Sequence, residues 1–129
     1  MAKIARFEDI EAWKKARELP KIIYEVTSQG QLVNDFVLKD QLRRASISVM
    51  ANIAAGFERE GNKDFRQVLA MAKGSAGEVK ALLYVPLDAG FLPLTKVNNT
   101  MALADEASRL LAGFLRYLQV SEKKGCKFQ

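Results

Sequence analysis

The sequence predicts an all-α protein that folds as an antiparallel up-down-up-down four-helix bundle. Apolar residues recur at steps of three and four over long stretches, which is typical of helices packed along a seam. Strand-like alternation is scarce, and the chain holds only three prolines in 129 residues. Short connections separate the periodic stretches, as in bundles of neighbouring antiparallel helices. We expect a single domain over 1–129, with helices at about 8–28, 35–58, 63–89 and 95–119 and a tail over 121–129.

The stretch from Leu38 to Glu78 organises the rest of the chain. It is expected to form two long helices that fold back on each other at the turn Glu60-Gly61-Asn62. The seam of the first helix recurs at steps of four and three through Leu38, Leu42, Ala45, Val49, Asn52 and Gly56. A second apolar row lies beside it and comprises Ile47, Met50, Ala54 and Phe57. A helix that is apolar over so much of its circumference is covered on more than one side.

The other helices have recognisable starts and irregularities. Pro20 interrupts the first periodic stretch, and the apolar pattern resumes beyond it, so we predict one kinked helix over 8–28. Asn34 or Asp35, Asn62 and Thr95 are the expected N-caps of the three later helices. In the third helix, Lys73-Gly74-Ser75-Ala76-Gly77 is a window of small residues where another backbone can approach closely.

Composition narrows the possible functions. The chain carries 20 basic and 15 acidic residues, a net charge of +5, which permits nucleic-acid binding without establishing it. Residues 93–129 hold six of the basic and three of the acidic residues, so much of the excess lies toward the C-terminal end. Cys126 is the single cysteine, and a chain without disulfides is expected in a reducing cytoplasm. No apolar run reaches the length of a membrane span, and the first residues lack a signal-peptide pattern.

The chemistry of known active sites is largely missing from the sequence. There is no histidine, which removes the commonest general base and the commonest metal ligand. Bundle di-iron sites require Glu-x-x-His pairs, and phosphate-binding glycine loops follow strands, so neither is expected. The serines have no histidine to activate them. We therefore expect no enzyme activity, no catalytic residue, no cofactor and no metal.

A polar row runs along the apolar helix 35–58, because Arg44, Ser48 and Asn52 are spaced four apart and share a face. With the turn centred on Gly61, residues facing each other across the two helices have numbers that sum to about 122. Arg44 then faces Glu78 and Ser48 faces Gly74, which predicts a structural polar cluster that fixes the register: Arg44, Ser48, Asn52, Gly74, Ser75 and Glu78. The functional alternative is a polar pocket that binds a small ligand or an RNA phosphate through Arg43 or Arg44.

Several segments together resemble a known family. They are Phe7-Glu8-Asp9-Ile10 with Trp13, Gln41-Leu42-Arg43-Arg44-Ala45 with Ser48, Asn52-Ile53-Ala54-Ala55-Gly56 with Arg59, and Phe65, Leu69 and Ala72-Lys73-Gly74-Ser75 with Glu78. Over about residues 7–118 the chain resembles the four-helix-bundle proteins encoded in intervening sequences of bacterial 23S ribosomal RNA genes. It departs from that pattern at Ala55, where Glu is usual, and at Lys73, where Arg is common.

The resemblance implies a small bacterial cytosolic protein that assembles into a ring-like homo-oligomer, with a pentamer favoured. The relatives of the resembled family include a bundle protein that accompanies a reverse transcriptase and binds nucleic acid. The family's biochemical role is poorly defined, so the resemblance bears on the fold more than on the function.

Two function hypotheses follow. The first is an RNA-associated homo-oligomeric accessory protein, with these candidate nucleic-acid contacts: Lys14, Lys15, Arg17, Lys21, Arg43, Arg116, Lys123, Lys124 and Lys127. The second is a protein-interaction scaffold without nucleic-acid affinity, which the five acidic residues within the first helical stretch favour. Helix 95–119 also has a second apolar row beside its seam, which comprises Leu103, Leu110, Phe114 and Tyr117. In both hypotheses the second apolar rows and the small residues serve self-association, so the expected partners are further copies of the chain and either RNA or another protein.

Overall fold

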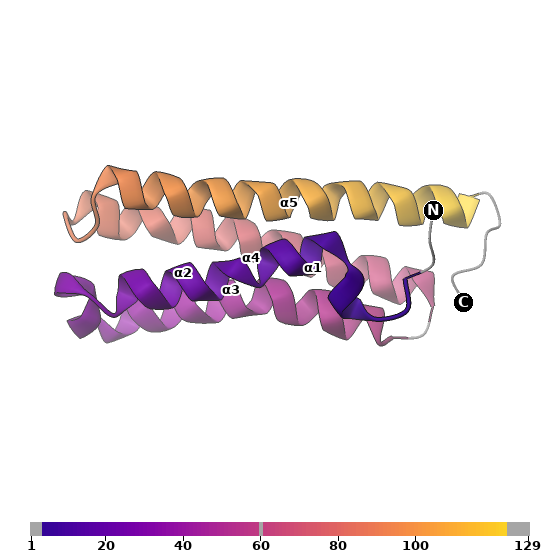
Figure 1. Ribbon diagram of the computed structural model, residues 1–129, viewed down its shortest axis with the longest axis horizontal. Coiled ribbons are helices and arrows are strands. Elements are labelled where there is room, and N and C mark those ends of the chain that lie inside the picture. Colours follow the sequence, from indigo (N-terminus) through magenta and orange to yellow (C-terminus); the bar gives the residue numbers. More distant parts are fainter. Residues whose placement is uncertain (1–3, 60, 124–129) are drawn as a thin grey trace.

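The computed structural model describes residues 4–59 and 61–123. This part of the chain is helical throughout and contains no strand (Figure 1). In chain order its elements are the 3₁₀ turn η1 (Phe7–Asp9), α1 (Glu11–Ala16), α2 (Glu18–Thr27), the 3₁₀ turn η2 (Gly30–Asn34), α3 (Phe36–Phe57), α4 (Asn62–Asp88) and α5 (Leu94–Lys123).

Four helical rods lie side by side along the long axis of the molecule (Figure 1). The helices α3, α4 and α5 form three of them, and α1 and α2 follow one another to form the fourth. The pair α3–α4 has the most extensive contact, followed by α4–α5, and α1 and α2 each pack against both α3 and α5. The predicted all-α four-helix bundle is therefore confirmed.

The predicted seams form the core, which has two parts. One part lies around Ile53, Leu69 and Leu111, and the other around Leu42 and Leu83. Most of the second apolar rows pack against the first part as half-buried side chains, among them Met50, Ala54, Phe57, Leu103, Leu110, Phe114 and Tyr117. Most of these rows are therefore covered within one chain, contrary to the expectation that they need a partner outside the bundle, and Ile47 is left exposed.

The expected kinked helix over 8–28 is instead divided into η1, α1 and α2. The break falls at Arg17, three residues before Pro20, and Pro20 becomes the third residue of α2. A proline ring crowds the carbonyl four residues earlier, here that of Ala16, and cannot donate to it, so the helical hydrogen bonds are interrupted there, although the Arg17 backbone keeps helical angles (φ −60°, ψ −26°). Pro20 then sits in a first turn, where the missing N–H has no required partner.

Pro20→Ala is accordingly expected to change the free energy of unfolding by less than about 1 kcal/mol. Alanine restores an N–H that the first turn does not need, and it allows α1 and α2 to merge without an added contact. Thermal unfolding followed by circular dichroism measures the change. A loss of about 2 kcal/mol or more would contradict this result and show that the packing requires the break at Arg17.

One of the N-caps predicted from the sequence is observed, and the others differ. Asp35 caps α3, and its side chain accepts a hydrogen bond from the Leu38 amide at 3.1 Å. Asn62 is the first residue of α4 and not its cap; its buried side chain donates to the Leu118 carbonyl at 3.3 Å. Gly61 precedes it with a φ of 93°, a conformation suited to glycine. The helix α5 begins at Leu94, before the expected cap Thr95, and continues to Lys123, beyond the expected end at 119.

Among the described helices, none combines the length and apolar character that crossing a membrane requires.

Candidate functional site

A small polar contact joins α3 and α4 where the sequence predicts a polar cluster. The hydroxyl groups of Ser48 and Ser75 share a hydrogen bond of 2.9 Å. Asn52 Nδ2 donates to the Ser48 carbonyl at 3.0 Å and to Ser48 Oγ at 2.9 Å. All three side chains are half-buried, so their polar atoms satisfy one another inside a mostly apolar contact. The structure thus brings together three of the six residues predicted for this cluster.

The predicted ion pair between Arg44 and Glu78 is wrong. Arg44 Nε instead donates to Asp40 Oδ2 at 2.9 Å, one turn earlier on the same helix. The Arg44 side chain is 79% exposed, and Glu78 and Gly74 also lie on the outer surface of the bundle. The predicted pairing of residue numbers across α3 and α4 is close to the observed one. Both charged side chains, however, project from the outer sides of their helices and do not enter the α3–α4 contact. Arg44 therefore pairs with Asp40, which lies one turn away on its own helix.

Arg44→Ala and Glu78→Ala should therefore each lower the free energy of unfolding by no more than about 1 kcal/mol, the range of exposed ion pairs. The double variant should show additive losses, because residues without a shared contact are thermodynamically independent. Urea unfolding of the two single variants and the double variant measures the coupling. A coupling energy of about 1 kcal/mol or more would show that these two side chains meet in solution.

The helix α4 carries a second periodic row on the side opposite the core. Its buried row runs at steps of four and three through Phe65, Leu69, Ala72, Ala76, Val79, Leu83 and Pro86. An exposed row with the same steps comprises Lys63, Gln67, Ala70, Gly74, Gly77, Ala81, Tyr84 and Asp88. The centre of this exposed row consists of four small residues, and a Cβ atom added at Gly74 or Gly77 would meet nothing within 4 Å.

The neighbouring helix α3 extends this small surface. Ile47, Ala51 and Ala55 lie exposed at steps of four, and Met71 on α4 is 60% exposed. We name the combined area the small-residue face: Ile47, Ala51, Ala55, Ala70, Met71, Gly74, Gly77 and Ala81. Glycine inside a helix costs about 1 kcal/mol relative to alanine, and no contact among the described residues requires glycine at 74 or 77. Ala55 and Lys73, the two departures from the family pattern, are both exposed.

Two of the four candidate cations on the first rod, Lys14 and Lys15, are paired with carboxylates. Lys14 Nζ lies 3.1 Å from Glu11, and Lys15 Nζ lies 3.4 Å from Glu18 and 3.5 Å from Glu106 on α5. Burial lowers the pKa of Lys15, but these two carboxylates outweigh burial and leave that pKa above its ordinary value. Lys15 is therefore charged at neutral pH, and the carboxylates of Glu18 and Glu106 partly compensate its positive charge.

The remaining candidate contacts have different surroundings. The Arg17 guanidinium lies 5.7 Å from the centre of the Trp13 ring, and Lys21 and Arg116 are exposed. Lys123 ends α5, with a side chain beyond what the structure describes. Lys124 and Lys127 lie outside the described residues. The grouping of the candidates on the first rod, on α5 and in the C-terminal tail into one contact surface stays a prediction.

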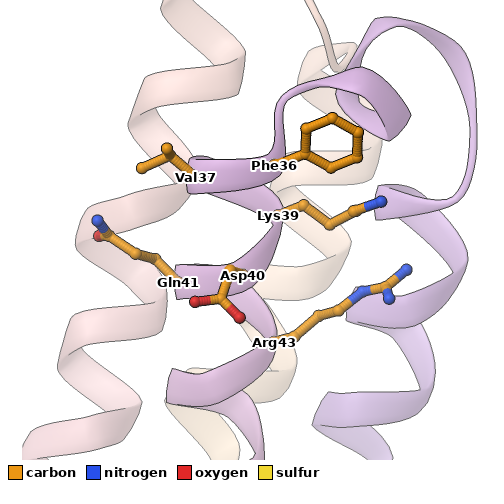
Figure 2. Close-up of a pocket in the computed structure, with 6 residues that line it drawn as sticks. All are labelled: Phe36, Val37, Lys39, Asp40, Gln41 and Arg43. Atoms are coloured by element: carbon orange, nitrogen blue, oxygen red, sulfur yellow. The ribbon is translucent and has the colours of Figure 1, made fainter.

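Arg43 lies between α2 and α3, and its guanidinium contacts residues at the end of α2. Its Nε donates to Thr27 Oγ1 at 2.9 Å and its Nη2 to Ser28 Oγ at 3.1 Å. The guanidinium carbon lies 4.1 Å from the centre of the Tyr24 ring. A shallow, open depression on α3 runs past this arginine, and Figure 2 shows the residues that line it: Phe36, Val37, Lys39, Asp40, Gln41 and Arg43.

Two of these residues, Phe36 and Lys39, were missed by the reasoning from sequence. Lys39 Nζ lies 5.0 Å from the centre of the Phe36 ring and donates to the Val33 carbonyl at 3.1 Å. The spacing Phe36-x-x-Lys39-x-x-x-Arg43 places the three side chains on one face of a helix, which is the signal that could have identified them.

Nothing in the described part of the chain provides a metal centre, since no three His, Cys, Asp or Glu side chains lie close enough together there to hold an ion.

Comparison with known proteins places this bundle in a family. The family model described as "23S rRNA-intervening sequence protein" matches residues 8–113. No functionally curated protein matches the chain. The fold is similar to a crystal structure from Bacteroides thetaiotaomicron of a protein with unknown function from the S23 ribosomal protein family. The TM-score is 0.74 with 21% identity, over 81% of this chain and 97% of the other. Because the family model covers most of the sequence, this chain belongs to the 23S rRNA-intervening sequence protein family.

Proposed function

We propose that this protein is a non-enzymatic bundle that assembles with further copies of itself and acts in the bacterial cytoplasm as an RNA-associated accessory factor. The observation that carries the proposal is the second periodic row of α4, whose centre is Ala70, Gly74, Gly77 and Ala81. A helix that serves only one core needs a single apolar row, and α4 has a second small-residue row on its outer side.

The occupant of the small-residue face is a helix of another copy of the chain. Glycine and alanine spaced three and four residues apart permit two helix backbones to approach closely. Such small side chains offer few contacts to a flexible ligand. Exposed Ile47 and Met71 flank that row and would gain burial in such a contact. A contact between this face and a different face of the next copy closes into a ring, and the family resemblance favours a pentamer.

The association with RNA is supported by charge and by the family. Each chain has a net charge of +5, and a ring multiplies that charge on one particle. The description of the matching family refers to 23S rRNA, which makes structured RNA the first ligand to test.

Two measurements test the proposal together. Light scattering coupled to size exclusion should give a mass that is a multiple of 14.4 kDa. Fluorescence anisotropy with a structured ribosomal RNA fragment, at low and at physiological salt, should show binding that weakens steeply as salt rises. A monomer mass would contradict the assembly, and no salt-sensitive binding at micromolar protein would contradict the association with RNA.

The second candidate function is a protein-interaction scaffold that has no affinity for nucleic acid. It is favoured by the carboxylate partners of Lys14 and Lys15, which reduce the positive potential of the first rod. Capture of partners from the native host with and without nuclease separates the two functions. Partners that are lost after nuclease treatment support RNA association, and partners that are retained support the scaffold.

A further inference from the structure

Two exposed aromatic rings and two cations form a surface patch where α2, η2 and α3 meet. We name it the aromatic–cation patch: Tyr24, Phe36, Lys39 and Arg43. Phe36 is 70% exposed and Tyr24 is 43% exposed, so both rings present area to solvent. Large aromatic residues usually belong to the core, which makes two such rings at one surface site a feature that needs a reason.

Each ring is paired with one cation, and the two pairs are neighbours. Lys39 Nζ lies 5.0 Å from the Phe36 ring centre, and Arg43 Cζ lies 4.1 Å from the Tyr24 ring centre. Lys39 and Arg43 are one helical turn apart, a rise of about 6 Å. Figure 2 shows the side chains of Phe36, Lys39 and Arg43 extending from the same side of α3, whereas Val37 and Gln41 extend from the opposite side.

The α2 helix holds the arginine in place. The Thr27 hydroxyl donates to the Ile23 carbonyl at 2.6 Å, and the Ser28 hydroxyl donates to the Tyr24 carbonyl at 2.7 Å. Their oxygens are therefore oriented to accept the two hydrogen bonds from Arg43. Arginine has five N–H donors, so three remain for a ligand, and the guanidinium is already ordered before the ligand arrives.

Within the described part of the chain, neither Lys39 nor Arg43 forms an ion pair with a carboxylate, although Asp40 lines the same depression. The hydrogen-bond acceptors of Lys39 and Arg43 are neutral: the Val33 carbonyl and the hydroxyls of Thr27 and Ser28. By contrast, Lys14, Lys15 and Lys80 each lie within 3.5 Å of a carboxylate. Of the nearby acids, Asp40 pairs with Arg44 and Asp35 accepts the hydrogen bond that caps α3.

From this geometry we propose that the aromatic–cation patch binds single-stranded RNA. Bases stack on the open faces of Phe36 and Tyr24, and Lys39 and Arg43 contact the adjoining phosphates. Exposed rings interleaved with cations are the chemistry that recognises an unpaired strand, because every base has a face to stack while the backbone is anionic. A duplex hides those faces, so an unpaired loop or strand is the expected ligand. The inference rests on the proposed association with RNA and specifies the class of RNA and the site.

The experiment uses the full chain, a short fluorescein-labelled oligouridylate, and a blunt RNA duplex of the same length. Phe36→Leu and Tyr24→Leu keep apolar side chains but remove the stacking surface. Each should weaken binding of the oligouridylate about tenfold, within the range measured for loss of one stacked base. Lys39→Gln should reduce the slope of log K against log salt by about 0.7, as expected for one lost contact to a single strand. The duplex should bind more weakly than the single strand.

Val85→Ala is the matched control, because Val85 is also an exposed apolar residue, at 50%, but lies on α4, outside the patch and outside the depression beside Arg43. It should leave the affinity unchanged within about twofold. If the wild-type chain binds the oligouridylate and the two leucine variants bind it equally well, the patch is not the site, and the RNA association survives without it. If the wild-type chain binds neither this probe nor structured RNA, both proposals fail. A changed particle mass for Phe36→Leu in light scattering would instead make the patch a contact between copies and overturn the inference.

Discussion

Gly56→Leu should lower the free energy of unfolding by about 3 kcal/mol, the upper part of the usual range for overpacked cores. Gly56 is buried near the end of α3, where α4 crosses it closely. A Cβ atom at this position would lie 3.0 Å from Phe65 Cδ1 and 3.2 Å from Val68 Cβ, both closer than ordinary van der Waals contact. The extra atoms of leucine must push into the α3–α4 contact, which is the most extensive in the bundle.

Chemical unfolding at one fixed protein concentration measures the loss. Gly113→Ala on α5 is the control, since its added Cβ has only the tip of the Arg116 side chain nearby, at 3.9 Å. That variant should be stabilising by up to about 1 kcal/mol through helix propensity. Combining Gly56→Ala with Phe65→Leu should recover part of the loss seen with Gly56→Ala alone, because the two residues compete for the same space. An unchanged midpoint for Gly56→Leu would mean that the crossing is looser than the structure has it.

The core of this fold was predictable because helix periodicity reports directly on burial. The seam of α3 was read from steps of four and three, and it includes Gly56 at the tight crossing. The turn at Gly61 was found from its residue type, and its φ of 93° explains the need for glycine there. With the turn known, the register followed to within one residue, since Ser48 meets Ser75 where Gly74 was expected.

Details that depend on the rotation of a helix about its own axis were not predictable. Arg44 and Glu78 lie at the expected heights, but a small difference in rotation decides whether two long side chains meet or turn to solvent. At Pro20 the chain can form one continuous bent helix or interrupt its helical hydrogen bonds, as it does beside Arg17. Tertiary packing of α1 against α5 and α3 decides that choice, and the local sequence does not record it.

The candidate sites were also predictable in part: the residue types were visible in the sequence, but their surroundings were not. The small residues at 74 and 77 were visible in the sequence, and only the structure shows that they lie outside the core with nothing near them. Arg43 was singled out as a cation, but its partners Thr27, Ser28 and Tyr24 come from another helix. Lys14 and Lys15 were singled out on equal terms and turned out to face carboxylates. A list of cations in a sequence therefore says little until the neighbours of each are known.

Under the proposed self-association through the small-residue face, Gly74→Leu should give a monomer of 14.4 kDa while leaving the isolated chain at least as stable as before. A leucine side chain at this position meets no atom of its own chain near Cβ, and leucine is a better helix former than glycine by close to 1 kcal/mol. A monomer would thus gain from the change. In a contact with a helix of a second copy, the same side chain stands where the two backbones approach, and it holds them apart.

Gly74→Ala is the graded control at the same position, because alanine matches the size of its row neighbours Ala70 and Ala81. It should retain the assembled mass, whereas Gly74→Leu should lose it at the same protein concentration. Light scattering coupled to size exclusion measures the mass, and the melting temperature of each variant shows whether the chain is folded. A Gly74→Leu protein that melts normally and still runs at the wild-type mass would place the contact between copies on another face of the bundle. If Gly74→Leu loses the assembled mass but keeps or raises the melting temperature, the substitution disrupts assembly without disrupting folding. That result would identify the outer row of α4 as the contact surface for another copy.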